Sequence, residues 1–92
     1  MIASFGCART EAVFHNEHVK GFPTDIIRSA HRKLLRLHVA PGLNYLRVPS
    51  ANRLEKLKGE LAGYWSIRIN DQYRIVFQWD GDAHNVRIVD YH

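Results

Sequence analysis

The side chains best suited to chemistry lie in the last third of the chain. Arg68 and Arg74 can bind an anion, because a guanidinium offers paired N–H donors that match a phosphate or a carboxylate. The chain ends in Asp90, Tyr91 and His92, and histidine is the side chain whose ordinary pKa lies nearest neutral pH. A tyrosine hydroxyl can orient or protonate an oxygen, and a carboxylate can hold a histidine or lysine in place. The arginines predict a site for an anionic ligand. A C-terminal histidine is by itself usually frayed and without a role.

Three strands joined by two short turns are predicted to position these residues, over 64–69, 73–79 and 85–91. An Asp-Gly pair between the last two is a strong hairpin signal. Side chains alternate between the two faces of a strand. The predicted core face carries Trp65, Ile67, Ile69, Tyr73, Ile75, Phe77, Trp79, Val86 and Ile88. The predicted polar face carries Tyr64, Ser66, Arg68, Arg74, Val76, Gln78, Arg87, Val89 and Tyr91.

The first half of the chain is predicted to supply helices and two further strands. Residues 2–5 suit a short strand and residues 9–14 a short helix. Apolar residues at spacings of three and four predict a longer helix over 24–38 with one buried stripe. Residues 43–48 suit either a turn of helix or an extended segment, and residues 52–59 an edge strand. The pattern predicts an α+β fold with its helices on one face of the sheet and the other face left for function.

Length and charge restrict the possible classes of protein. A chain of 92 residues forms one domain. The net charge of +4 and the pI near 9.6 favour nucleic acid, an anionic membrane or an acidic protein as partner, and charge alone does not choose among them. The single cysteine, Cys7, cannot form an intramolecular disulfide and indicates a reducing compartment. Without a long apolar run or a signal peptide, the chain is expected in the cytoplasm.

The predicted long helix carries a stripe of basic residues. Arg28, Arg32 and Arg36 recur at a spacing of four, and Lys33 lies beside them. One interpretation is a solvated helix face. The other is a docking surface for phosphates or for an acidic segment of a partner protein.

Three stretches, in this order and at this spacing, resemble one family. They are Asn52 to Gly59 (NRLEKLKG), Gly63 to Phe77 (GYWSIRINDQYRIVF) and the terminal Asp90-Tyr91-His92. Together they are similar to the HigB toxins, also called plasmid maintenance killer proteins, of the RelE/ParE superfamily. The opening five residues and the Arg32-Lys33-Leu34 run match as well. The resemblance covers nearly the whole chain.

The resemblance implies a RelE-like α+β fold, in which an N-terminal strand and two helices pack on one face of a mainly antiparallel sheet of four to five strands. It also implies a toxin of a type II toxin–antitoxin system that enters the ribosomal A site and cuts messenger RNA. The expected partners are a HigA-like helix-turn-helix antitoxin and the ribosome with its messenger RNA. Operator DNA is expected to be bound only through the antitoxin, and no membrane is expected to be bound. No metal or cofactor is expected.

Carried over residue by residue, the family pattern places Lys58, Arg74, Asp90, Tyr91 and His92 in the active site. Glu55 stands where some HigB members have a histidine, and it can serve as a base or form a surface ion pair with Lys56 or Lys58. Contacts with RNA or the ribosome are expected from Arg53, Lys56, Arg68, Arg28, Arg32, Lys33 and Arg36.

The same residues also allow simpler structural roles and two other functions. Arg68 and Arg74 can pair with Asp71, with Glu60 or with the terminal carboxylate. A non-catalytic toxin of the same fold, like the ParE branch that acts on DNA gyrase, has no need for the Asp-Tyr-His tail or for Lys58. A general RNA-binding module would bind free RNA with steep salt dependence.

Overall fold

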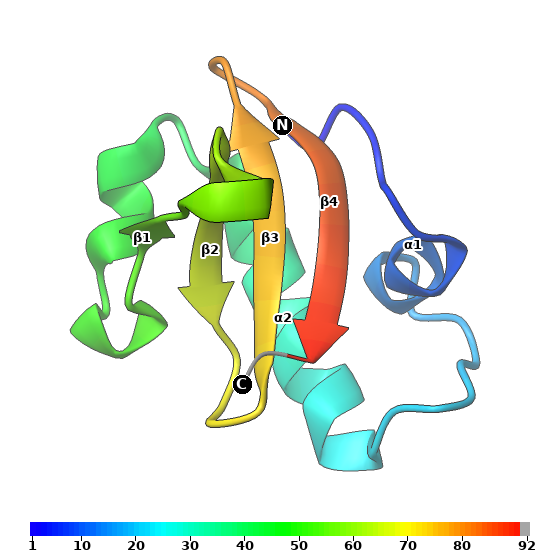
Figure 1. The fold of residues 1–92 in the computed structure, drawn as a ribbon. Helices are drawn as coiled ribbons and strands as arrows, with labels where there is room; N and C mark the ends of the chain where they lie inside the picture. Colours follow the sequence, from blue (N-terminus) through cyan, green and yellow to red (C-terminus); the bar gives the residue numbers. More distant parts are fainter. Residues whose placement is uncertain (91–92) are drawn as a thin grey trace.

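An antiparallel sheet with the strand order β1-β2-β3-β4 forms the centre of the computed structural model, which describes residues 1–90 (Figure 1). Its strands are β1 (Glu55–Lys56), β2 (Tyr64–Arg68), β3 (Tyr73–Trp79) and β4 (Ala83–Asp90). Each strand pairs with the next one along the chain. This arrangement confirms the meander that period-two alternation predicts.

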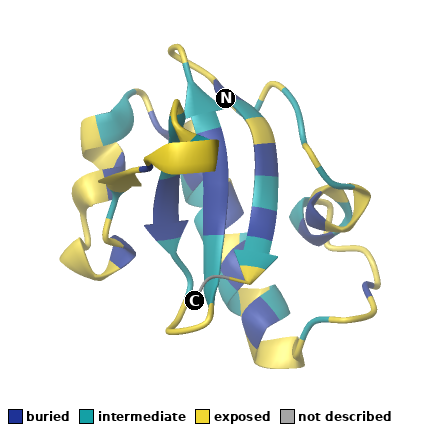
Figure 2. Cartoon of the chain, in the orientation of Figure 1, coloured by how far each residue is buried: buried dark blue, intermediate teal, exposed yellow. Residues whose placement is uncertain are grey.

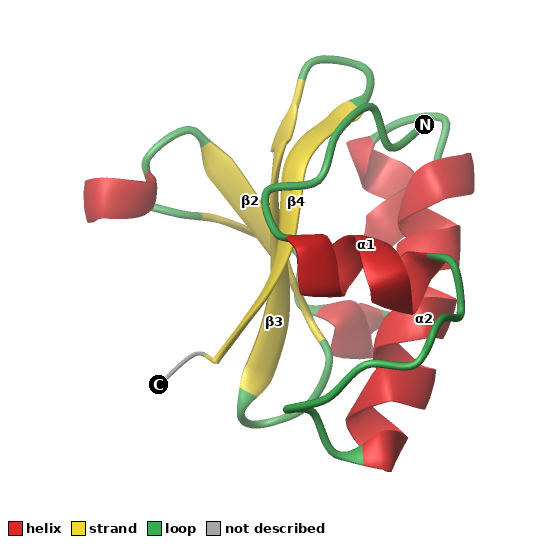
Figure 3. Ribbon diagram, turned by 90° about the vertical axis from the view of Figure 1, so that its right-hand side faces the viewer, coloured by secondary structure: helices red, strands yellow, loops and turns green. Residues whose placement is uncertain are grey.

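Two α-helices of the described residues lie on one side of this sheet, and Figure 3 shows them there. They are α1 (Ala8–Phe14) and α2 (Thr24–Val39). Two short 3-10 helices, η1 (Leu43–Arg47) and η2 (Ser50–Asn52), lead from α2 to β1. A third, η3 (Gly59–Leu61), projects from the opposite side of the sheet (Figure 3). The α+β prediction, with helices on one sheet face, is confirmed.

The core lies between α2 and the sheet, where Figure 2 shows buried positions on both elements. Apolar residues of α2 recur every three or four positions and so form one stripe along the helix. The sheet meets this stripe with the alternate residues of β2, β3 and β4. Burying each such side chain contributes roughly 1.5–3 kcal/mol. The core residues, each at most 1% exposed, include Val13, Leu34, Leu37, Leu46, Ile67, Ile75, Phe77 and Val86.

A buried hydrogen bond connects α1 to the last strand. The Oγ1 atom of Thr10 accepts a hydrogen bond of 2.9 Å from the backbone N–H of Ile88. Thr10 is fully buried and Ile88 is 8% exposed. The bond satisfies an edge-strand donor that water does not reach, so it fixes α1 beside β4.

The predicted strand over residues 2–5 was wrong, because this segment makes only isolated parallel bridges to β4. Ile2 pairs with Ala83 and Phe5 pairs with Val86. The backbone between them bonds differently, since the N–H of Asn85 donates to the Ser4 hydroxyl at 2.9 Å. Asn85 also has a φ of 54°, which breaks the regular ladder.

The edge strand predicted over residues 52–59 is reduced to Glu55 and Lys56. Asn52 belongs to η2, and Arg53 adopts a left-handed φ of 46° that interrupts an extended segment. After Lys58 the chain turns into η3. In contrast, β4 begins at Ala83, two residues before the predicted start at Asn85.

Candidate functional site

The sheet face opposite α1 and α2, called the front face below, brings together Glu55, Ser66 and Arg74. Glu55 of β1 lies directly opposite Ser66 of β2, and Ser66 lies opposite Val76, two residues after Arg74 on β3. The Nη1 atom of Arg74 donates a 3.0 Å hydrogen bond to the Ser66 hydroxyl. Its Nη2 atom lies 3.6 Å from a carboxylate oxygen of Glu55. Two neighbouring strands therefore hold this guanidinium.

Burial makes this contact effective. The Arg74 side chain is 11% exposed, whereas the Glu55 side chain is 48% exposed. Ser66 is fully buried, so its hydroxyl meets the guanidinium without competition from water. The ion pair expected for Glu55 with Lys56 or Lys58 is instead made with Arg74. The result is a fixed positive charge on the front face, which suits binding of an anion.

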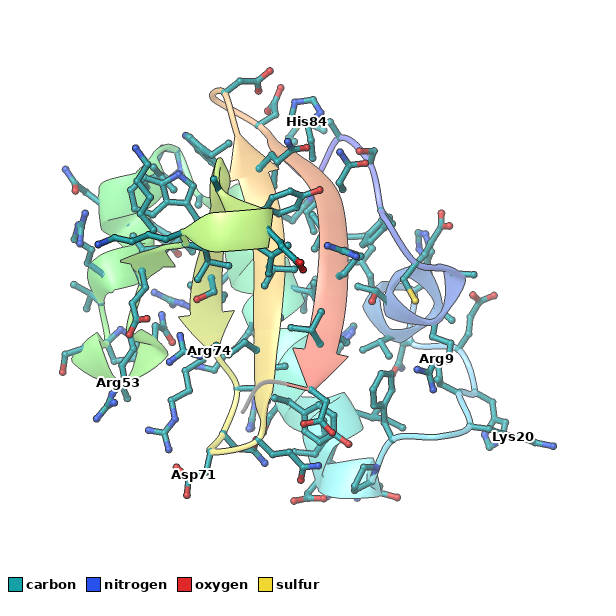
Figure 4. The ribbon with its side chains drawn as sticks, in the orientation of Figure 1. Arg9, Lys20, Arg53, Asp71, Arg74 and His84 are labelled. Carbon is teal, nitrogen blue, oxygen red and sulfur yellow. The ribbon has the colours of Figure 1, made fainter. Side chains whose placement is uncertain are left out.

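Arg68 occupies the same face but turns away from this cluster. It lies directly opposite Arg74 in the strand register, and like charges in that position repel. Arg68 pairs with Asp71 in the turn after β2, the simpler of its predicted roles. Figure 4 shows Arg74 and Asp71 at the same end of β2. The two arginines are thus directed to different carboxylates.

The front face is less open than side-chain alternation alone suggests. Val76, at its centre, is fully buried. Arg87 of β4 lies opposite Val76, and its guanidinium carbon is 5.6 Å from the centre of the Tyr64 ring on β2. Because β3 lies between β2 and β4, the contact between Arg87 and Tyr64 bridges the front face over β3.

Ser66 and Arg87 are candidate site residues that sequence reasoning missed. Alternation placed both on the polar face, and nothing in the local pattern showed that Ser66 would contact Arg74. Arg87 has a buried Nε atom without a hydrogen-bond partner among residues 1–90. A Cβ on Gly6 would lie 2.8 Å from Cγ and Cδ of Arg87, so the glycine leaves room for the stem of this arginine.

Lys58 lies where the chain leaves β1 on the front side. Leu57 before it is 8% exposed and donates its backbone N–H to the carbonyl of Tyr64 at 2.8 Å. Lys58 itself is exposed and directly precedes η3, which projects from the front face (Figure 3). The buried leucine therefore anchors the segment that presents this lysine.

Asp90 ends β4 beside the turn between β2 and β3. It pairs with Tyr73 in the register, which gives it the core-face parity predicted for it. Its carboxylate accepts a 3.1 Å hydrogen bond from the Gln72 amide. The other two predicted tail residues, Tyr91 and His92, lie outside the described residues.

The basic residues predicted on the long helix lie on the other side of the sheet. Arg28 and Arg32 are exposed on α2. Lys33 donates a 2.5 Å hydrogen bond to the buried Asn52, and Arg36 donates a 2.8 Å hydrogen bond to the carbonyl of Val48. Burial lowers the pKa of Lys33, and the nearby Arg36 and Arg32 lower it further. Lys33 and Arg36 thus fasten the η1–η2 segment to α2.

The remaining two predicted RNA contacts lie near the β1 edge. The Nζ atom of Lys56 is 6.0 Å from the centre of the Trp65 ring, its partner in the register. Alternation places Lys56 on the face opposite to that of Glu55. Arg53 is exposed just before β1 and is labelled in Figure 4. Lys56 therefore lies on the face opposite to that of Glu55 and Arg74.

Several histidines make structural contacts. The Nδ1 atom of His38 accepts a 3.1 Å hydrogen bond from the backbone N–H of Ile2. The Nδ1 atom of His31 lies 3.0 Å from the carbonyl of Val13, and the Nε2 atom of His84 lies 2.8 Å from Asp80. Among residues 1–90, no cluster of three or more histidine, cysteine and acidic side chains is placed to hold a metal ion. No helix in that range could cross a membrane.

Residues 5–92 match the family of HigB-like toxins, described as RelE-like toxins of the HigB type II toxin–antitoxin system. Toxin HigB-1 of Vibrio cholerae is 48% identical over 64 residues, which cover 68% of this chain and 67% of that protein. Endoribonuclease HigB of Proteus vulgaris is 31% identical over 93 residues, an alignment that covers 100% of this chain and 100% of that protein.

Solved structures show the same fold at lower sequence identity. A chain of the YoeB–YefM complex from Staphylococcus aureus matches with a TM-score of 0.59 and 21% identity, over 100% of this chain and 98% of that chain. A YoeB/ParE toxin from Agrobacterium tumefaciens matches with a TM-score of 0.50 and 22% identity, over the full length of both chains.

Proposed function

The chain belongs to the family of HigB-like toxins, RelE-like toxins of type II toxin–antitoxin systems, and we propose that it is a ribosome-dependent endoribonuclease. It would cut messenger RNA in the ribosomal A site and so stop translation. The observation that carries this proposal is the guanidinium of Arg74, held on the front face by Ser66 and Glu55. A relative that aligns with this chain over its full length is named an endoribonuclease, which supports the proposal.

The chemistry of RNA cleavage assigns a role to each predicted residue. The ribose 2′-hydroxyl must lose its proton, the phosphate gains negative charge, and the leaving 5′-oxygen must be protonated. Arg74 would stabilise the charge on the phosphate, because its position is fixed before the substrate arrives. Lys58, exposed at the start of η3, would supply a second cation.

In this proposal the last three residues, Asp90, Tyr91 and His92, carry out or support proton transfer. His92 has the ordinary pKa best suited to a general acid or base near neutral pH. Tyr91 would orient a reacting oxygen or stack on a base, and Asp90 would hold a neighbouring group in place. Glu55 would serve Arg74 as counter-ion, since its carboxylate lies 3.6 Å from that guanidinium. The reaction as proposed uses no metal ion.

Membership of a toxin–antitoxin family supports an antitoxin as partner. A HigA-like helix-turn-helix antitoxin would neutralise this toxin, and operator DNA would be bound only through that antitoxin. The ribosome would supply both the messenger RNA and its alignment. These events would take place in the cytoplasm.

The test is to map messenger RNA cleavage by primer extension in a purified translation system, with and without ribosomes. We expect cuts that follow the reading frame and require ribosomes. Cleavage of free RNA at the same rate would contradict the requirement for ribosomes. Intact messenger RNA, in the presence of a wild-type protein that still arrests growth, would refute the enzyme and favour a ParE-like action on gyrase.

A further inference from the structure

The outer side of α2 carries a regular row of exposed residues. Arg28, Arg32, Leu35 and Val39 follow one another at spacings of four, three and four, so they form one ridge along the helix. Leu35 is 43% exposed and Val39 is 62% exposed. The core residues of α2, such as Leu34, face the sheet on the other side of the helix.

The segment after α2 extends this surface. The guanidinium carbon of Arg36 lies 4.8 Å from the centre of the Tyr45 ring, and its Nη2 atom bonds the carbonyl of Val48. Tyr45 is 37% exposed and Val48 is 67% exposed. Through Arg36, both residues lie next to the ridge of α2.

This region collects most of the exposed large apolar side chains. Of the five such residues in the range 1–90, four lie here, namely Leu35, Val39, Tyr45 and Val48. Single exposed apolar residues are ordinary on a protein surface, but a group of them beside one another marks a binding surface.

The segment that contains α2 and the residues after it has an excess of basic over acidic side chains. Residues 24–54 contain six lysines and arginines and one acidic residue, Asp25. The whole chain has 13 basic and 9 acidic residues, which leaves seven basic and eight acidic residues outside this segment. The segment 24–54, six basic residues minus one acidic, therefore carries a net charge of +5, and the rest of the chain, seven minus eight, carries −1.

We propose that this α2 surface, formed by Arg28, Arg32, Leu35, Val39, Tyr45 and Val48, binds an acidic amphipathic helix of the antitoxin. The inference rests on the proposed function, because it takes the antitoxin as the partner. Carboxylates of that helix would pair with Arg28 and Arg32 near the start of α2. Its apolar residues would cover Leu35 and Val39 near the end.

Two features favour a protein helix over ribosomal RNA as the occupant. The alternating spacing of four, three and four forms a stripe along α2 of the kind that packs against another helix. Covering the apolar half of this surface with another apolar surface removes it from water, which favours binding. The phosphate backbone of RNA is charged and cannot cover it in this way. Figure 3 shows α2 on one side of the sheet. Arg74 contacts Ser66 on the front face, so an antitoxin helix bound to α2 leaves that face uncovered.

The experiment measures the affinity of the full-length toxin for its antitoxin by titration calorimetry. The variants are Leu35→Gln with Val39→Gln, and Arg32→Glu. Lys20→Glu is the control for the charge change, since Lys20 is exposed on the loop between α1 and α2 (Figure 4). Arg74→Ala tests docking on the front face. Circular dichroism verifies that each variant is folded.

We expect both α2 variants to weaken antitoxin binding about tenfold or more, whereas Lys20→Glu and Arg74→Ala bind within about twofold of wild type. The Leu35/Val39 variant should still cut messenger RNA on the ribosome. The proposal is overturned if both α2 variants bind the antitoxin as wild type does, or if Arg74→Ala is the variant that loses it.

Two further outcomes separate this proposal from its alternatives. If the α2 variants lose affinity for ribosomes and keep their affinity for the antitoxin, the surface is an RNA contact and the proposal fails. If wild type does not cut messenger RNA while the α2 variants still lose the antitoxin, the endoribonuclease proposal fails and the docking surface stands.

Discussion

The guanidinium of Arg74 donates a 3.0 Å hydrogen bond to the hydroxyl of Ser66, a side chain that is fully buried. The two residues belong to neighbouring strands and meet diagonally across the front face. Glu55 approaches the same guanidinium from β1 at 3.6 Å. A cation held in this way needs no rearrangement when negative charge develops beside it, which is how preorganised groups lower a reaction barrier.

Ser66 is therefore expected to act as a positioning residue for Arg74. Ser66→Ala removes the hydroxyl and should lower the single-turnover rate of messenger RNA cleavage on the ribosome by about tenfold, with a loss of about 0.5–1.5 kcal/mol in stability. Ser66→Thr keeps the hydroxyl and should restore most of the rate. Equal rates for wild type and Ser66→Ala would show that the hydrogen bond does not matter for cleavage.

Glu55 is expected to balance the charge of Arg74 without transferring protons. Glu55→Gln keeps a polar oxygen beside the guanidinium and should lower the cleavage rate by less than about tenfold. Loss of a general base costs about a hundredfold to ten-thousandfold. A loss of that size in Glu55→Gln, measured under single-turnover conditions in folded protein, would identify Glu55 as the base.

Thr10 is expected to contribute to stability through its bond with the N–H of Ile88. Thr10→Val keeps the shape of the side chain but leaves a buried donor without a partner, which costs about 1–3 kcal/mol. Thr10→Ser keeps the acceptor and serves as the matched control. Urea denaturation of the three proteins gives the free energies of unfolding. A valine variant at least as stable as the serine variant would contradict this account.

Asp80 is expected to make stability depend on acid pH. The backbone N–H of Asp82 donates to its carboxylate, the His84 side chain lies 2.8 Å from it, and both lower its pKa below the ordinary 3.8. Since the folded pKa is the lower one, the stabilisation is complete above pH 3.8 and is lost as pH falls through the folded value.

The measurement for Asp80 compares the free energy of unfolding of wild type with that of Asp80→Asn as the pH falls. The difference should be constant above the ordinary pKa and should shrink below it, because the asparagine does not titrate. A carboxylate titration by NMR gives the folded pKa directly. A midpoint at or above 3.8 would refute the assignment.

Much of the fold follows from local patterns in the sequence. Strict alternation in residues 73–79 placed Ile75 and Phe77 on the core face, and both are fully buried. The spacing of apolar residues predicted α2 to within one residue of its observed end at Val39. Such patterns succeed because burial against one layer imposes the same period on the residues and on the backbone.

The parts that could not be predicted depend on contacts between distant residues. Lys33 and Arg36 looked like members of a uniform basic stripe, but Lys33 bonds Asn52, 19 positions away, and Arg36 bonds Val48. Alternation assigned Ser66 and Arg74 to the same face, and their hydrogen bond confirms this. Alternation did not predict that Ser66 would be buried beneath Arg74, because it carries no information on which side chains cover a face.

The most direct test of the central proposal is the rate of messenger RNA cleavage on programmed ribosomes by wild type, Arg74→Ala and Lys20→Ala. Both substitutions remove one positive charge, but Lys20 lies on the loop between the helices, away from the front face (Figure 4). We predict that Arg74→Ala loses about a hundredfold or more in rate and that Lys20→Ala matches wild type. Cleavage by folded Arg74→Ala at the wild-type rate would contradict the account.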